Sequence, residues 1–157
     1  MIQDCYESPL GLIHLCCDDG FLSAVTFAGQ KYENQHISEN VVFGSHPVLE
    51  QTKAWLSLYF EGKIPDFLPP LKPEGTPFQQ KVWELLLEIP YGQTITYGCL
   101  ARKLGCKSAQ AVGGAVGRNP ISILIPCHRV MGADGKLTGY AGGLSRKEAL
   151  LKSEHIL

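Results

Sequence analysis

Residues 121–130 read Ile-Ser-Ile-Leu-Ile-Pro-Cys-His-Arg-Val. The first five residues have the composition of a short buried strand. Proline cannot continue a central strand, so Pro126 is expected to end it and to turn the chain. Cys127 is then placed at the edge of a cleft, beside His128 and Arg129. Because a cysteine attacks as its thiolate and cationic neighbours lower its pKa, this pattern predicts a nucleophilic thiol.

The composition indicates a globular, cytoplasmic protein. The chain has 157 residues, of which 45% are hydrophobic, and no apolar run approaches the ~18 residues that span a membrane. The start of the chain lacks a basic segment followed by an apolar core, so no signal peptide is expected. The six cysteines include no Cys-x-x-Cys pair, so neither a disulfide framework nor a metal site is expected. We also expect no membrane partner and a monomeric state.

The net charge of −1 conceals a division between the two halves of the chain. Residues 1–75 hold four lysines and ten acidic residues, whereas residues 76–157 hold ten basic and five acidic residues. Such asymmetry suggests two modules with different partners. The positive half suits a polyanion, although a patch of this size is also common on solvated surfaces.

The first half predicts hairpins and one helix, and the second half predicts helices, which together favour an α+β fold. Asp19-Gly20 lies between apolar runs and is a strong hairpin signal. Apolar spacing predicts a helix over residues 46–59. Residues 30–40 are polar and predict a loop. The predicted strands cover residues 4–8, 12–17 and 21–27.

A proline-rich segment, residues 61–77, is predicted to be the linker between two domains, 1–75 and 76–157. After it, Thr76-Pro77 opens a helix that runs to Pro90. Thr94 or Thr96 caps a second helix that ends at Gly105, and Ser108 caps a third that ends at Gly117. The second and third helices form a helix-turn-helix pattern. Ser145 is expected to cap a final helix.

The third helix is built almost entirely from small residues. It holds three glycines in ten residues, and each costs about 1 kcal/mol of helix stability. A helix this thin suits close approach to another surface, either inside the core or against a ligand.

Several ordered motifs resemble those of the O6-alkylguanine-DNA alkyltransferases, also called methylated-DNA–protein-cysteine methyltransferases. The resemblance covers residues 76–157 closely and the first half more weakly. Its motifs are Phe78-Gln79-Gln80-Lys81-Val82-Trp83, Thr96-Tyr97, Ala111-Val112-Gly113-Gly114-Ala115, Asn119-Pro120, Pro126-Cys127-His128-Arg129-Val130 and Gly139-Tyr140-Ala141-Gly142-Gly143.

The resemblance implies a ribonuclease-H-like sheet domain followed by a winged-helix-like domain. It implies irreversible, single-turnover transfer of an alkyl group from O6-methylguanine, and also from O4-methylthymine, in double-stranded DNA to Cys127. The damaged base leaves the stack for this reaction. The damaged base supplies the alkyl group, so no cofactor is expected.

The resemblance also assigns site residues. Cys127 is the nucleophile, and His128 acts on it through a water and is oriented by Glu148. Tyr97 contacts the flipped base, and Asn119 braces the turn before the nucleophile. The base pocket is assigned to Val130, Tyr140, Ala141, Gly142 and Gly143. The DNA-binding residues are assigned as Ser108, Gln110, Ala111, Gly114, Arg118 and Arg129, although Arg129 could instead brace the pocket from behind.

Gln110 departs from the family pattern, in which many members carry an arginine that fills the gap left by the flipped base. Glutamine fills space but carries no charge. We therefore expect retained flipping, weaker DNA affinity and a shallower salt dependence.

Other functions remain open from the sequence. A cysteine hydrolase could use Cys127, His128 and Glu148, but it would need an oxyanion hole and would turn over. A lesion sensor or a helix-turn-helix regulator would bind DNA without chemistry. The reactive cysteine argues against a sensor, and the absence of a dimerisation segment argues against a regulator.

Overall fold

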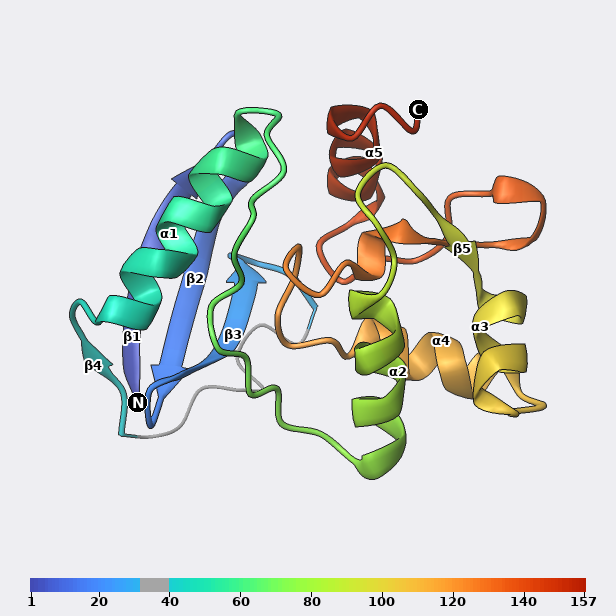
Figure 1. Ribbon diagram of the computed structural model, residues 1–157, viewed down its shortest axis with the longest axis horizontal. Helices are drawn as coiled ribbons and strands as arrows, with labels where there is room; N and C mark the ends of the chain where they lie inside the picture. The colour runs from blue at the N-terminus through green and yellow to red at the C-terminus, as the bar shows by residue number, and fades with distance from the viewer. Residues whose placement is uncertain (32–39) are drawn as a thin grey trace. The chain divides into compact units, whose positions relative to one another are not determined.

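The computed structural model describes residues 1–31 and 40–157, so most of the predicted loop at residues 30–40 lies outside the described residues. The chain divides into two units (Figure 1). The first comprises Met1–Glu74 with Pro120–Ser122, and the second comprises Gly75–Asn119 with Ile123–Leu157. The predicted α+β fold is confirmed. In the described part, no helix is long and apolar enough to cross a membrane.

The first unit is built on an antiparallel sheet. Its strands are β1 (Ile2–Ser8), β2 (Gly11–Asp18) and β3 (Phe21–Phe27), with β4 (Val42–Phe43) parallel to β1. The order is β3-β2-β1-β4. Asp19 and Gly20 both have positive φ, 50° and 78°, as the predicted two-residue hairpin requires.

Helix α1 (Pro47–Phe60) covers one face of this sheet (Figure 1). It buries the aliphatic and aromatic residues that the helical spacing predicted, including Leu49, Leu56 and Tyr59. Its N-cap is His46, whose Nδ1 accepts from the Val48 amide at 3.1 Å. Lys53 of α1 and Asp4 of β1 are both partly buried, and their charges pair at 2.6 Å.

Two short segments cover the outer edge of β3, which would otherwise expose unpaired backbone groups. Leu71 in the linker bridges to Leu22, and Ile121 bridges to Val25. The predicted strand over 121–125 is therefore wrong, because only Ile121 pairs with a strand. Ile123 then takes a φ of 71°, a left-handed conformation that a β-branched residue rarely adopts and that cannot continue a strand.

The second unit is mostly helical. Its elements are α2 (Pro77–Leu87), β5 (Ile95–Thr96), α3 (Tyr97–Leu104), α4 (Ala109–Gly117), the 3-10 helix η1 (Cys127–Arg129), β6 (Val130–Met131), the 3-10 turn η2 (Ala133–Gly135) and α5 (Leu144–Ser153). Strands β5 and β6 form a parallel pair. The helix-turn-helix is α3 and α4, joined after Gly105, whose φ is 64°.

The helix starts follow their capping residues. Thr76 and Gln79 form a reciprocal capping box at α2, and Thr96 and Ser108 accept from Cys99 and Ala111. The expected cap at Ser145 is wrong. Helix α5 starts one residue before Ser145, after Gly143, whose positive φ of 94° turns the chain.

Helix α4 is held at its buried side by α2 and α3. Trp83 of α2 is 1% exposed, and its Nε1 donates to the Ala115 carbonyl oxygen at 2.9 Å. Val112 and Val116 point into the same core. This packing leaves the opposite side of the thin helix exposed.

Candidate active site

Cys127 is the first residue of η1 and is 6% exposed. Its amide donates to the Ile125 carbonyl oxygen at 2.8 Å, which closes a tight turn around Pro126. Burial raises the pKa of the Cys127 thiol, while a hydrogen bond with Asn119 and the charge of Lys147 oppose that rise. The thiol therefore needs a base, or a nearby positive charge, to react as thiolate at neutral pH.

Asn119 follows the end of α4 and is 4% exposed. Its Nδ2 donates to the Ile125 carbonyl oxygen at 2.8 Å. The side chain thus spans the turn that leads to the nucleophile, which is the contact expected of a brace.

His128 is fully buried, and its Nε2 lies 2.6 Å from Oε2 of Glu154. Burial lowers the pKa of His128 more than the Glu154 carboxylate raises it, so the ring is neutral at pH 7. With the proton on Nε2, donated to Glu154, Nδ1 is the basic nitrogen of the ring. The arrangement can accept a proton and stabilise the resulting imidazolium.

The sequence assigned the wrong glutamate to His128. Glu148 is on the outer side of α5, where its carboxylate pairs with Lys152 at 3.2 Å. Glu154 is 2% exposed and follows the same helix. The missed signal was the helical stripe Lys147, Leu150, Leu151, Glu154, whose spacing is that of a buried face and excludes Glu148.

Arg129 was expected among DNA-binding residues, but it is 8% exposed and bonded inside the unit. Its Nε donates to Oε1 of Glu154 at 2.8 Å, and its Nη1 donates to the Ile89 carbonyl oxygen at 2.7 Å. The Gly92 amide also donates to Oε1 of Glu154. Glu154 therefore has one oxygen for His128, while the other is fixed by Arg129 and Gly92. The structure supports the bracing alternative for Arg129.

Tyr97 is the first residue of α3 and is half-buried. Burial raises the pKa of its hydroxyl, and the nearby Cys127 adds to the rise, while Thr138 opposes it. The charge of a Cys127 thiolate therefore acts on the Tyr97 hydroxyl. Its hydroxyl stays protonated at neutral pH and can donate.

The residues assigned to the base pocket follow Cys127 in the chain. Val130 is fully buried in β6. Tyr140 and Ala141 are half-buried, and Gly142 is buried. The Gly142 carbonyl oxygen accepts from Nη1 of Arg146 at 3.1 Å, and Gly143 precedes α5.

The remaining residues assigned to DNA binding share the exposed side of α4 and its ends. They are Ser108, Gln110, Ala111, Gly114 and Arg118. An added Cβ at Gly114 would meet no atom within 4 Å, so packing inside the protein does not require glycine there. The exposed side is narrow and carries one cation, Arg118.

Lys147 is a second buried charge that the sequence analysis missed. It is 0% exposed, and its Nζ donates to the carbonyl oxygens of Val130 at 2.6 Å and Thr138 at 2.8 Å. It precedes Leu150 on the buried stripe of α5. The sequence signalled this burial, because the lysine occupies a position on the apolar face of α5.

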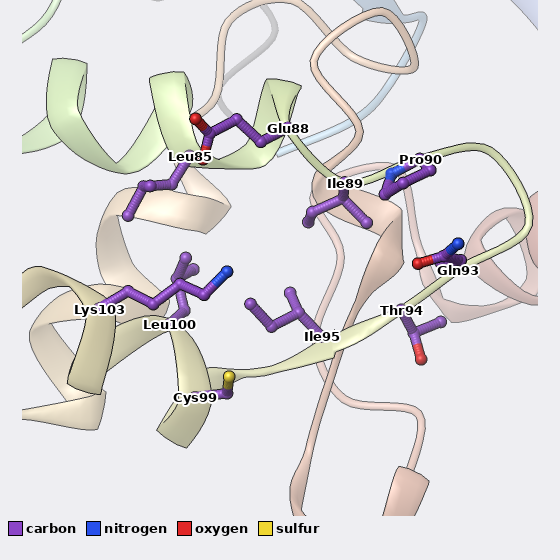
Figure 2. A pocket seen from close by; sticks show the side chains of 10 residues that line it. All are labelled: Leu85, Glu88, Ile89, Pro90, Gln93, Thr94, Ile95, Cys99, Leu100 and Lys103. Carbon is purple, nitrogen blue, oxygen red and sulfur yellow. The ribbon is translucent and has the colours of Figure 1, made fainter.

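A separate pocket of about 260 Å³ lies between the end of α2 and α3 (Figure 2). Half of its lining residues are aliphatic, and the others, Glu88, Gln93, Thr94, Cys99 and Lys103, contribute polar atoms. It contains none of the residues assigned to the reaction. Elsewhere, no group of three or more His, Cys, Asp or Glu side chains could hold a metal ion among residues 1–31 and 40–157.

Comparisons with known proteins agree with this geometry. The 6-O-methylguanine DNA methyltransferase ribonuclease-like domain matches residues 1–73, and the DNA binding domain of the same family matches residues 77–156. A methylated-DNA–protein-cysteine methyltransferase of Methanosarcina acetivorans is 47% identical over 95% of both chains, and one of Haemophilus influenzae is 42% identical over 96% of this chain and 84% of its own. A crystal structure of Mycobacterium tuberculosis OGT in complex with DNA superposes with a TM-score of 0.88 at 40% identity, covering 98% of this chain and 92% of that one. The chain belongs to the 6-O-methylguanine DNA methyltransferase family.

Proposed function

We propose that this protein repairs DNA by moving the methyl group of O6-methylguanine in a duplex onto Cys127, once per molecule. The observation that carries the proposal is a buried thiol next to a neutral histidine, with the histidine tied to Glu154. Such a set activates a thiol for nucleophilic attack.

The reaction forms a bond between Sγ of Cys127 and the methyl carbon as the bond from that carbon to O6 breaks. The thiol proton passes to His128, through a water as in the family, and the guanine takes up a proton as its oxygen leaves. Tyr97, protonated and close to the nucleophile, is suited to donate toward the leaving base. The thioether product has no ready hydrolytic route, so the protein acts once.

Glu154 replaces Glu148 in this proposal. Its carboxylate orients the ring of His128 and stabilises the imidazolium after proton transfer. Asn119 holds the turn at Ile125, so that the thiol keeps its position. Arg129 acts as a positioning residue through Glu154.

The methyl carbon lies inside the duplex, so the damaged nucleotide is extruded into the pocket of Val130 and Tyr140 to Gly143, at a cost of about a few kcal/mol. The thin exposed side of α4 suits the minor groove, which is only about 6 Å wide. Gln110 is exposed on that helix and fills the gap in the stack. O4-methylthymine carries its methyl group on an equivalent oxygen and is proposed as a second substrate.

The test is a repair assay with a duplex that bears one O6-methylguanine, in which restored guanine is counted per protein molecule. Stoichiometric repair that stops at one event, and that is lost in Cys127→Ser, supports the proposal. Binding to the lesion without repair would instead indicate a sensor. Repeated turnover of an ester or amide substrate would indicate a hydrolase.

A further inference from the structure

The chain turns sharply over residues 90–93, between the end of α2 and the start of β5. The Gln93 amide donates to the Pro90 carbonyl oxygen at 3.1 Å, and Gly92, the third residue of the turn, has a φ of 81°. A positive φ at this position is typical of a type II turn and favours glycine. The local sequence therefore shapes the turn, and its two central residues, Tyr91 and Gly92, make their hydrogen bonds with another segment of the unit.

That segment is the end of α5, where Tyr91 and Gly92 hold Glu154 at two points. The Tyr91 hydroxyl donates at 3.1 Å to the carbonyl oxygen of Ser153, which belongs to the peptide group that joins Ser153 to Glu154. The Gly92 amide donates to Oε1 of the Glu154 carboxylate at 3.1 Å. One contact fixes the backbone next to Glu154 and the other fixes its side chain. The remaining oxygen, Oε2, is the one that contacts His128 at 2.6 Å.

Arg129 connects Tyr91 to the same carboxylate. The guanidinium carbon lies 5.8 Å from the centroid of the Tyr91 ring, a distance at which a cation is attracted to an aromatic face. The same guanidinium group donates from Nε to Glu154 and from Nη1 to the carbonyl oxygen of Ile89, two residues before Tyr91. The Tyr91 ring therefore contributes to the position of the arginine that binds Glu154.

The Tyr91 hydroxyl is in the protonation state that this contact needs. Burial raises its pKa, the charge of Glu154 adds to the rise, and the charge of Arg129 opposes it. The hydroxyl thus keeps its proton at neutral pH and donates it to Ser153. A phenylalanine at this position would keep the ring beside Arg129 and lose the hydrogen bond alone.

We propose that Tyr91 is a positioning residue for alkyl transfer, which acts on His128 through the position of Glu154. The proposal rests on the proposed function for its role in repair. A carboxylate held at hydrogen-bonding distance stabilises the imidazolium that forms when His128 takes up the thiol proton. Without the Tyr91 hydroxyl, the end of α5 loses one of its contacts to the turn, and Glu154 stabilises that imidazolium less.

The experiment measures single-turnover methyl transfer from an O6-methylguanine duplex against pH. The variants are Tyr91→Phe, which removes the hydroxyl and keeps the ring, and Tyr91→Leu, which removes both. The matched control is Tyr6→Phe in the first unit. Tyr6 is also half-buried, and its hydroxyl shares a hydrogen bond of 3.1 Å with that of Ser57.

We expect Tyr91→Phe to slow transfer at neutral pH by about fivefold, as for the loss of one hydrogen bond, and Tyr91→Leu to slow it more. Burial lowers the pKa of His128, Glu154 opposes this fall, and the charges of Arg129 and Lys147 add to it. A less firmly held Glu154 therefore moves the acid limb of the rate to lower pH, by about half a unit. Tyr6→Phe is expected to leave both the rate and the limb unchanged. A mere loss of stability would not move the limb in this direction.

A double substitution tests the route from Tyr91 to His128. If Tyr91 acts through Glu154, Tyr91→Phe slows the Glu154→Gln variant less than it slows the wild type. Independent, multiplicative effects of the two substitutions would overturn the proposal. So would a wild-type rate and acid limb in Tyr91→Phe, or an equal change in Tyr6→Phe. If Tyr91→Leu does not fold, Tyr91→Phe decides, because it keeps the ring.

A titration of the His128 ring by NMR, in the protein without DNA, separates this proposal from the proposed function. The signal of His128 is identified by its loss in His128→Gln. A wild type that transfers no methyl group would contradict the proposed function, and the titration would still decide the role of Tyr91. A lower midpoint in Tyr91→Phe than in the wild type and Tyr6→Phe supports the proposal, and equal midpoints would overturn it.

Discussion

His128 and Glu154 form a buried hydrogen bond of 2.6 Å between Nε2 and Oε2, and Arg129 and the Gly92 amide hold the second oxygen of the same carboxylate. The geometry fixes the tautomer of the ring, because the proton lies on the nitrogen that faces Glu154. Only the other nitrogen can then act as a base. The relay therefore depends on how firmly Glu154 is held.

Glu154→Gln is expected to slow methyl transfer by about 10²-fold or more, because an amide can present the wrong group to Nε2 and cannot stabilise the imidazolium. The single-turnover rate constant with O6-methylguanine duplex measures this. Glu148→Gln on the same helix is the matched control and is expected to leave the rate within about twofold, as for an exposed surface pair. Equal effects of the two substitutions would contradict the assignment of Glu154.

The methyl-transfer rate is expected to have an acid limb below pH 6.5. Burial, the largest cause, lowers the pKa of His128 from 6.5, so the neutral base persists through neutral pH and is lost when the pH falls through the lowered value. The unfolded chain takes up this proton near pH 6.5, so folding stability should also decline as pH drops below that value. Single-turnover rates across this pH range test the predicted acid limb of methyl transfer, and urea unfolding tests the predicted decline in stability. A rate that already falls between pH 8 and 7 would point to another base.

Gln110→Arg is expected to strengthen DNA binding. The slope of log affinity against log salt concentration is expected to become steeper by about one unit. The reason is the added charge on the exposed side of α4. Binding to an undamaged duplex at several salt concentrations measures the slope. Gln93→Arg adds the same charge outside α4 and is expected to change the slope less. Identical slopes for both variants would count against α4 as the interface.

The stability of the wild type relative to a variant without the Lys147 charge is expected to rise with pH. Burial lowers the pKa of Lys147 to about 8 from 10.5 in the unfolded chain. Between these values the unfolded state binds the extra proton, so the free energy of unfolding rises with pH, by roughly 3 kcal/mol in total. Denaturant unfolding from pH 7 to 10.5 gives the free energy of unfolding of the wild type and of Lys147→Met. The difference between these two free energies should change with pH in this window. Parallel curves would contradict a buried ammonium group.

The sequence predicted the local structure best where side chains act on their own backbone. Thr76, Thr96, Ser108 and Gly105 mark helix ends by capping or by positive φ, and the structure follows them. The Asp19-Gly20 hairpin belongs to the same class. These signals depend on neighbours in the chain and do not need tertiary contacts.

The errors arose where tertiary packing decides. Apolar residues 121–125 look like a strand, but only Ile121 pairs with β3, and Ile123 turns the chain. Glu148 was predicted from the resemblance alone, whereas the helical spacing of the buried face of α5 places Glu154 on the inside. Arg129 was predicted to bind DNA because its local sequence gives no sign that it is buried. Its acidic partner, Glu154, lies 25 residues away in the chain.

The most direct test is the mass of the intact protein after mixing with a slight excess of duplex that carries one O6-methylguanine. We predict a gain of one methylene per protein, mapped to Cys127 and absent in Cys127→Ser. Unchanged mass with tight binding to the lesion, or a methyl group on another cysteine, would contradict the account.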